Sequence, residues 1–199
     1  MNLLQACTII ENARKDAVLV ATMGAMFAFD GIKAAQPRIS SVPLMGGAAS
    51  LGLGLAIAEP LRKIIVVDGD ASLLMQLGGL ATVADRQPAN FVHFVVRNGA
   101  QFTGVANLAT PAESCVDYAG LAAAAGYRRT YRFEDETELA AHIDEVMSGG
   151  GPTFVELRVV TPPPIPGAPT KMEIPDMQFQ RMGVEARALS TWLQEHARG

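Results

Sequence analysis

Two short stretches of this chain are almost wholly apolar and rich in β-branched residues. They are residues 64–67, Ile-Ile-Val-Val, and residues 91–96, Phe-Val-His-Phe-Val-Val. A strand with one face in water alternates apolar and polar residues, whereas a strand covered on both faces does not. The two stretches therefore predict central strands of a sheet with helices packed on both sides.

Strand and helix patterns alternate along the chain as far as residue 160. This alternation predicts an α/β protein, a three-layer α/β/α fold with a mainly parallel sheet. One expected strand is more polar than the others and should lie near an edge of the sheet. This polar strand is 127–133. Besides it and the two central strands, the expected strands are 17–21, 37–44 and 153–160, and the expected helices are 3–10, 24–35, 46–58, 72–86, 117–126 and 135–148.

We expect two parts, a domain over residues 1–160 and a C-terminal arm over residues 161–199. Residues 161–169 contain five prolines in nine positions, which predicts an extended, semi-rigid linker. Beyond it, apolar residues recur at helical spacing, which predicts a terminal helix. The sequence leaves open whether this helix packs on its own domain or on a neighbouring subunit. The recurring residues are Met182, Ala186, Leu189 and Leu193.

Composition argues against several classes of protein. The 199 residues carry a formal net charge of −4 with no clustered basic face, so we expect no nucleic-acid partner. Residues 39–58 are uncharged but contain Pro43 and four glycines, and we expect no membrane span. The two cysteines cannot form a disulfide framework, and the first residues lack a secretory signal. We therefore expect a cytoplasmic protein.

Polar side chains follow the two central strands directly. Asp70 comes after the first strand and Gly69, and Asn98 ends the second strand 28 residues later. Parallel strands place their carboxyl ends at one edge of a sheet, where ligands bind. Carboxylate and amide oxygens suit Mg²⁺, and backbone N–H groups at a helix start favour phosphate. Each half alone is common turn chemistry, but together they predict a metal-bridged diphosphate.

At these residues the chain resembles a known family. Gly69-Asp70-Ala71, followed by Asn98, is similar to the Gly-Asp-Gly…Asn motif of thiamine diphosphate enzymes. Residues 44–56 and 66–80 look more closely like the β subunit of sulfopyruvate decarboxylase and the C-terminal half of phosphonopyruvate decarboxylase. The resemblance covers about residues 1–160 and implies the thiamine diphosphate-binding fold. It also implies that Mg²⁺ is held by Asp70, Asn98 and the backbone carbonyl of Ala100.

The resemblance gives further residues a role in binding thiamine diphosphate. Met45 would support the bent cofactor and bond the aminopyrimidine through its N–H, and the carbonyl of Pro43 would accept from the 4′-amino group. From the sequence alone, Met45 would pass for an ordinary core methionine. The remaining cofactor-binding residues that the resemblance implies are Leu44, Gly69, Ala71, Ser72, Gln101 and Phe102, together with the metal ligands.

Several positions depart from the family pattern. Ala71 replaces the last glycine of the motif, Arg97 stands where many relatives have asparagine, and Pro43 stands where glycine is common. Residues 101–104 also differ from the family near the substrate. The metal ligands survive these changes, so the departures affect the choice of substrate rather than the choice of cofactor.

One expected group is missing from this chain. Enzymes of the family need a glutamate against the pyrimidine N1′, and it belongs to a separate pyrimidine-binding domain. Glu11 and Glu59 look like carboxylates on helix surfaces. We therefore expect the activating glutamate on a pyrimidine-domain (α) subunit, and we expect the two chains to form a hetero-oligomer. No catalytic residue is assigned within this chain.

The hypothesis is a β subunit of a thiamine diphosphate- and Mg²⁺-dependent decarboxylase, a carboxy-lyase acting on a small 2-oxo acid. A carboligase subunit similar to acetolactate synthase is the nearest alternative. A nicotinamide-binding oxidoreductase domain built on Gly52-x-Gly54 is a second one, although those glycines do not directly follow a buried strand and no third glycine completes the fingerprint. A third is a scaffold or regulatory subunit that keeps the fold without turnover.

Other polar residues have weaker claims to a functional role. His93 lies in an apolar strand and is expected to be a core or interface histidine. Arg128, Arg129 and Arg132 are expected on a solvated face, with attraction of an anionic substrate as the alternative. Two residues could face the substrate by their position alone, and two histidines are expected on helix surfaces. These are Thr103, Asn107, His142 and His196.

Overall fold

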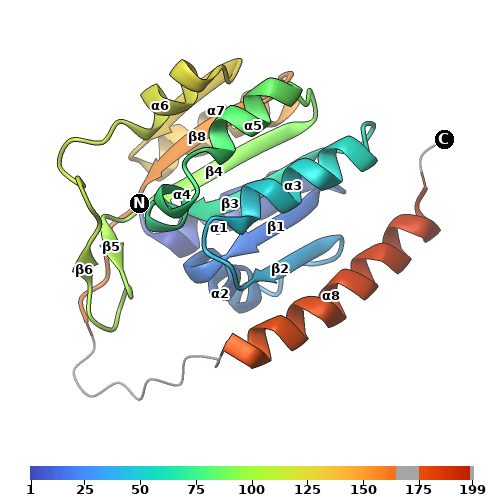
Figure 1. Cartoon of the computed structure of the whole chain (residues 1–199), viewed down its shortest axis with the longest axis horizontal. Coiled ribbons are helices and arrows are strands. Elements are labelled where there is room, and N and C mark those ends of the chain that lie inside the picture. The colour runs from blue at the N-terminus through green and yellow to red at the C-terminus, as the bar shows by residue number, and fades with distance from the viewer. Residues whose placement is uncertain (165–174, 198–199) are drawn as a thin grey trace.

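The computed structural model describes residues 1–164 and 175–197. Its centre is a six-stranded sheet in the order β2-β1-β3-β4-β8-β7, and every neighbouring pair in it is parallel (Figure 1). The apolar stretches form the middle strands, and the polar strand β7 lies at an edge, as predicted. The strands are β1 (Val18–Thr22), β2 (Arg38–Val42), β3 (Ile64–Gly69), β4 (Phe91–Arg97), β7 (Arg129–Phe133) and β8 (Thr153–Arg158).

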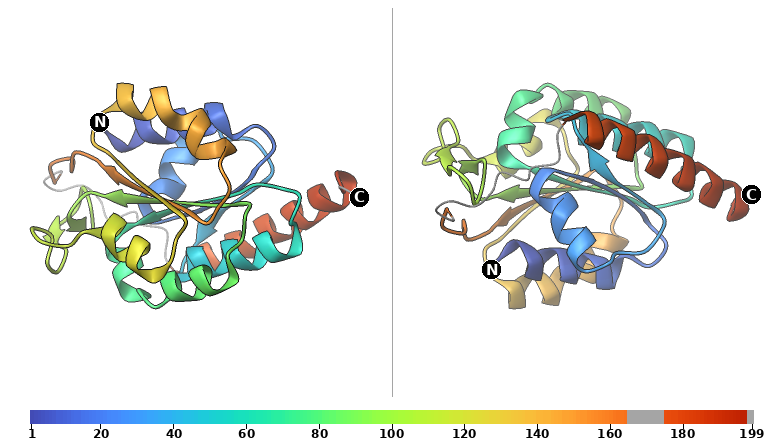
Figure 2. Two further views of the ribbon diagram at one scale, coloured as in Figure 1. Left: turned by 90° about the horizontal axis from the view of Figure 1, so that it is seen from above. Right: turned by 90° about the horizontal axis from the view of Figure 1, so that it is seen from below.

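Helices cover both faces of the sheet, which gives the predicted three layers (Figure 2). One face packs against α1 (Leu3–Arg14), α2 (Met23–Gly31) and α7 (Glu136–Ser148). The other face packs against α3 (Gly47–Ala58), α4 (Asp70–Met75), α5 (Gly79–Arg86), α6 (Tyr118–Ala125) and α8 (Pro175–Glu195). Both faces of β3 and β4 are buried under helices. Most residues of these two strands are therefore apolar, whichever face they point to.

Two helix predictions were wrong in their extent. The single helix expected over residues 72–86 is divided into α4 and α5, and α4 already begins at Asp70. The break falls at Gln76, whose N–H bonds the carbonyl of Leu73 in a tighter turn and whose Cβ faces Gly46. The helix expected over 24–35 ends at Gly31, and Lys33 adopts a positive φ of 55° that a helix cannot continue through.

The terminal helix α8 packs on its own chain, beside the edge strand β2 (Figure 1). Leu189 is 4% exposed and joins the same core as α3, with Met182 and Leu193 packed against it. Glu185 accepts hydrogen bonds from the backbone N–H and the hydroxyl of Ser40 in β2. The question that the sequence left open is thus answered for α8, whereas most of the expected proline-rich linker lies outside the described residues.

Residues 39–58, the uncharged stretch, are shared between β2 and the twelve-residue helix α3. Among the helices in the described part of the chain, none is long and apolar enough to cross a membrane.

Candidate functional site

Asp70 lies at the carboxyl end of β3, as the first residue of α4. Its side chain is only 2% exposed. One carboxylate oxygen accepts a hydrogen bond from the N–H of Gly99 at 2.8 Å, and the other accepts from the N–H of Ala71 at 2.8 Å. Since β3 and β4 end side by side, with Gly69 opposite Val96, the sheet itself brings the Asp70 turn to the Asn98 turn. The predicted meeting of the two motifs is present.

Asn98 is the centre of a small hydrogen-bonded loop. Its Oδ1 accepts from the N–H of Ala100 at 3.0 Å, and its Nδ2 donates to the Thr103 hydroxyl at 2.8 Å. That hydroxyl donates to the carbonyl of Ala100 at 3.2 Å. The Thr161 hydroxyl also donates to the Asn98 carbonyl and joins the start of the arm to this loop. The three oxygen donors that the resemblance implied therefore belong to one connected structure.

Burial and hydrogen bonding act on the Asp70 carboxylate in opposite directions. Burial raises its pKa above the ordinary value, while the N–H groups of Gly99, Ala71 and Asn98 and the charge of Arg97 pull it down. A bound cation would stabilise the charged form that burial disfavours. A Cβ at the neighbouring Gly69 would have no atom within 4 Å, so the backbone beside Asp70 is open to a ligand. This all-oxygen donor set fits Mg²⁺.

The loop of Pro43, Leu44 and Met45 is attached to the same site. The N–H of Gly46 donates to the Ser72 hydroxyl at 2.8 Å, which ties the end of this loop to α4. Gly46 has a φ of +87°, and a Cβ there would lie 2.5 Å from the Cβ of Gln76. Only glycine therefore allows this close approach. Leu44 is 59% exposed, whereas Pro43 and Met45 are half-buried.

A two-stranded ribbon completes this edge of the molecule (Figure 1). It pairs β5 (Ala100–Gln101) with β6 (Leu108–Ala109) in antiparallel fashion. Gln101 is half-buried, and Phe102 is 56% exposed with a φ of +51°. Ala71, the departure from the family motif, is buried within α4 and keeps a helical backbone that needs no glycine.

Sequence reasoning missed the buried ion pair behind the site. Arg97, at the end of β4, donates to Glu156 of β8 at 2.9 Å and to the carbonyl of Glu113 at 2.5 Å. Glu156 is fully buried and also accepts from Arg132 at 3.3 Å and from the N–H of Ala119 at 3.2 Å. A glutamate in the middle of an otherwise apolar strand was the available signal. Arg97, which departs from the family pattern, therefore has a buried ion-pair partner in Glu156.

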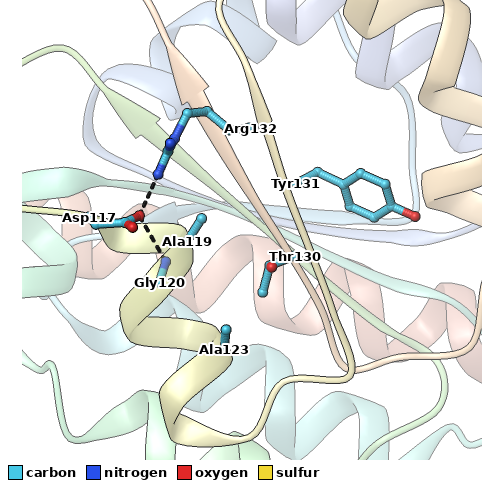
Figure 3. Close-up of a pocket in the computed structure, with 7 residues that line it drawn as sticks. All are labelled: Asp117, Ala119, Gly120, Ala123, Thr130, Tyr131 and Arg132. Carbon is cyan, nitrogen blue, oxygen red and sulfur yellow. Dashed lines mark hydrogen bonds and ion pairs between the residues drawn. The ribbon is translucent and has the colours of Figure 1, made fainter.

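The other arginines lie away from the Asp70–Asn98 site. Arg132 bonds Asp117 at the rim of a cavity of about 300 Å³ between α6 and β7, where Thr130 and Tyr131 also line the wall (Figure 3). Arg129 pairs with Glu145 at 3.0 Å, and Arg128 donates to Gln87 at 2.7 Å. The cavity borders the edge strand β7 rather than the ends of β3 and β4. It therefore does not coincide with the predicted site.

The histidines and loop polar groups also have identifiable surroundings. His93 is fully buried, with Nδ1 3.3 Å from the Tyr127 hydroxyl and Nε2 3.8 Å from Asp68, so it is a core histidine. Asn107 accepts from the N–H of Gly104 and donates to the carbonyl of Pro162, which braces the ribbon. Thr103 belongs to the site, because its hydroxyl accepts a hydrogen bond from Asn98 Nδ2. The exposed histidines, as expected, are His142 and His196.

Gly52 and Gly54 do not form a dinucleotide-binding turn. Both lie inside α3, and a Cβ on Gly52 would be 2.3 Å from Val66 Cγ2 in β3. Gly52 therefore lets the helix approach the sheet, whereas Gly54 has open space beside it. The fingerprint needs glycines in the turn between strand and helix, so this geometry argues against a nicotinamide site.

A doubly covered parallel sheet with polar turns meeting at its carboxyl edge defines a cofactor-binding α/β domain. Residues 21–157 match the family described as "Thiamine pyrophosphate enzyme, C-terminal TPP binding domain". The chain belongs to this thiamine pyrophosphate enzyme family.

The chain covers less than two thirds of the length of the curated relatives that it matches. Phosphonopyruvate decarboxylase from Streptomyces viridochromogenes is 41% identical over 119 residues, which are 59% of this chain and 29% of that protein. Sulfopyruvate decarboxylase subunit beta from Methanothermobacter thermautotrophicus is 34% identical over 115 residues, 58% of each. An X-ray structure from Mycobacterium smegmatis, assigned as a thiamin diphosphate-dependent enzyme, superposes with a TM-score of 0.67. At 22% identity, covering 80% of this chain and 32% of the other, it shows a shared fold.

Proposed function

We propose that this chain is the diphosphate- and Mg²⁺-binding subunit of a thiamine diphosphate-dependent 2-oxo acid decarboxylase. The observation that carries the proposal is the buried Asp70 carboxylate bonded to the Asn98 turn through Gly99, in a chain of the thiamine pyrophosphate family. Its relatives named as phosphonopyruvate and sulfopyruvate decarboxylases favour a small 2-oxo acid that carries a second acidic group.

The residues of this chain divide the work of holding the cofactor. Asp70, Asn98 and the carbonyl of Ala100 would hold Mg²⁺, and the backbone around Gly69, with Ala71 and Ser72, would face the diphosphate. Pro43, Leu44 and Met45 would support the pyrimidine end, since the Gly46–Ser72 hydrogen bond fixes their distance from α4. Gln101 ends strand β5 of the ribbon and Phe102 follows it, and both would face the cofactor. The bound cofactor supplies the electron sink for decarboxylation.

A pyrimidine-domain partner would complete the site. Several large apolar side chains from the loops and short elements at this edge are exposed, and exposed apolar surface is a common feature of interaction sites. Glu11 and Glu59 are paired with Arg14 and Arg62 elsewhere in the fold, which supports a glutamate supplied by another chain. The two thiols fit the reducing cytoplasm that we expect for this hetero-oligomer. The exposed apolar side chains at this edge are those of Leu44, Met75, Phe102, Val105 and Leu108.

Asp70→Ala tests the site assignment. We expect Mg²⁺-dependent binding of thiamine diphosphate to fall at least about a hundredfold, because a charged metal ligand is lost. Binding is measured by calorimetry on the complex purified from its native source. Asp85→Ala is the matched control, since Asp85 on α5 is 73% exposed and, among the described residues, pairs with its neighbour Arg86 alone. Full Mg²⁺-dependent binding by Asp70→Ala would refute the assignment.

The reaction is tested with the same complex. Sulfopyruvate and phosphonopyruvate should release CO₂ and give the corresponding aldehydes, with activity absent from either chain alone. Condensation products without free aldehyde would instead favour the carboligase alternative, and no turnover with any 2-oxo acid would favour the scaffold alternative.

A further inference from the structure

Tyr118, the first residue of α6, has a buried hydroxyl without a hydrogen-bond partner. The residue is 1% exposed, and within the described residues nothing bonds its hydroxyl oxygen. Buried polar atoms in folded proteins are nearly always bonded, so such an exception needs a reason. Asp117 caps α6 by accepting from the N–H of Gly120, which holds the helix start and fixes the position of Tyr118.

The surroundings of Tyr118 connect it to the Asp70–Asn98 site. The guanidinium carbon of Arg97, the residue before Asn98, lies 5.6 Å from the centre of the Tyr118 ring. Burial raises the pKa of Tyr118 to about 12, and the Asp70 carboxylate is the charge that adds most to this effect. The phenol therefore keeps its proton at neutral pH and can act as a hydrogen-bond donor.

Asp70 has unused capacity to accept hydrogen bonds. A carboxylate offers about four acceptor positions. The N–H groups of Gly99 and Ala71 occupy one on each oxygen. One remaining position can serve a cation, and another is left for a further hydrogen-bond donor.

We propose that Tyr118 is a positioning residue that orients the Asp70 carboxylate for the divalent cation. Its hydroxyl donates to Asp70, directly or through one ordered water, when cation and diphosphate bind. The inference rests on the proposed function, because it assumes that Asp70 is a cation ligand. It explains why a phenol, which adds an unpaired hydroxyl to the protein interior, stands at this position.

Tyr118→Phe removes only the hydroxyl oxygen. We expect the affinity of the full chain for inorganic diphosphate with Mg²⁺ to fall about tenfold, the usual effect of losing a hydrogen bond to a charged group. The unfolding midpoint of the ligand-free chain should be unchanged or higher, because an unpaired buried hydroxyl is removed. Calorimetric titration and thermal unfolding measure the two quantities, and a purely structural tyrosine would leave the affinity unchanged.

Thr153→Val is the matched control. The Thr153 hydroxyl is also buried and unbonded in the described structure. Thr153, however, begins β8 at the amino ends of the strands, whereas the Asp70–Asn98 site lies at their carboxyl ends. Removal of the Thr153 hydroxyl should leave the affinity unchanged. Wild-type affinity in Tyr118→Phe, or an equal loss in Thr153→Val, would overturn the inference alone. Absence of saturable Mg²⁺-dependent diphosphate binding by the wild-type chain would overturn the proposed function and the inference with it.

Discussion

Among the described residues, four of the eight buried side-chain polar atoms without a hydrogen-bond partner belong to residues at or near the carboxyl ends of β3 and β4. These atoms are Asp68 Oδ2, Arg97 Nε, Thr110 Oγ1 and the Tyr118 hydroxyl. Each such atom costs about 1–3 kcal/mol of stability. Real proteins accept such costs mainly at functional sites, where local order is arranged for a ligand rather than for the folded chain alone.

The backbone at Gly46 gives a stability prediction at this scale. Gly46→Ala should lower the free energy of unfolding by at least about 1–2 kcal/mol, because a side chain is strained at φ +87° and would press against Gln76. Urea unfolding measures the change. The same variant should weaken Mg²⁺–thiamine diphosphate binding, since the loop of Pro43–Met45 loses its anchor on Ser72. Unchanged stability would show that the loop relaxes freely.

The two thiols should differ sharply in reactivity. Burial raises the pKa of Cys7 from 9.0 to about 12, whereas Cys115 is exposed. In the native chain one thiol should react rapidly with a disulfide reagent at pH 8, and both should react in denaturant. Cys115→Ser should abolish the rapid phase. A rapid phase that survives in this variant would contradict the burial of Cys7.

The Cys7 thiol also sets a direction for stability against pH. Its pKa in the folded chain is higher than in the unfolded chain, so the folded state holds the proton more tightly. The contribution of Cys7 to stability is therefore complete below about pH 9 and is lost as the pH rises toward about 12. Cys7→Ala should flatten this part of the stability profile, measured by urea unfolding between pH 8 and 11.

At the scale of helices and strands, the sequence pattern predicted the elements whose formation depends on local composition. The buried strands β3 and β4 are recognisable because no face of either needs polar residues. The break between α4 and α5 was not predictable, because the apolar spacing of Leu73, Leu80 and Val83 runs through it. It depends on Gly46, which approaches from a distant part of the chain and packs on Gln76.

The candidate site also has a part that the sequence could predict and a part that it could not. Asp70 and Asn98 could be paired from the sequence because consecutive parallel strands must end together. The contact of Arg97 with Glu156 could not, since it depends on β8 being inserted beside β4. The role proposed for Tyr118 depends in turn on where α6 begins. Such contacts follow from strand order, which no local pattern encodes.

Helix α3 offers a matched pair of glycine substitutions. Gly52→Ala should destabilise the chain by about 1–3 kcal/mol, because its Cβ would fall 2.3 Å from Val66 Cγ2 and 3.1 Å from Phe91. Gly54→Ala on the same helix meets open space and should stabilise by about 0.5–1 kcal/mol. Urea unfolding of both variants measures the contrast. Equal effects would mean that α3 does not pack on β3 as described.

At the scale of the whole molecule, α8 is a structural part of the fold. Leu189→Ala should lower the free energy of unfolding by about 2–4 kcal/mol, because Leu189 is 4% exposed in the same core as α3. Val184→Ala on the same helix should change it by less than about 0.5 kcal/mol, since Val184 is 59% exposed. Denaturant unfolding compares them. Similar small effects in both variants would indicate that α8 is detached in solution.

The contact between Ser40 and Glu185 has a consequence for assembly. β2 is an edge strand, and the N–H of Ser40 donates to the Glu185 carboxylate at 2.9 Å. An outward-facing N–H is what an incoming strand would need in order to extend a sheet, and α8 already uses it. Addition of a strand from a second molecule is therefore blocked on this side. A subunit that approaches the β2 edge must therefore meet the side chains of α8 rather than the backbone of β2.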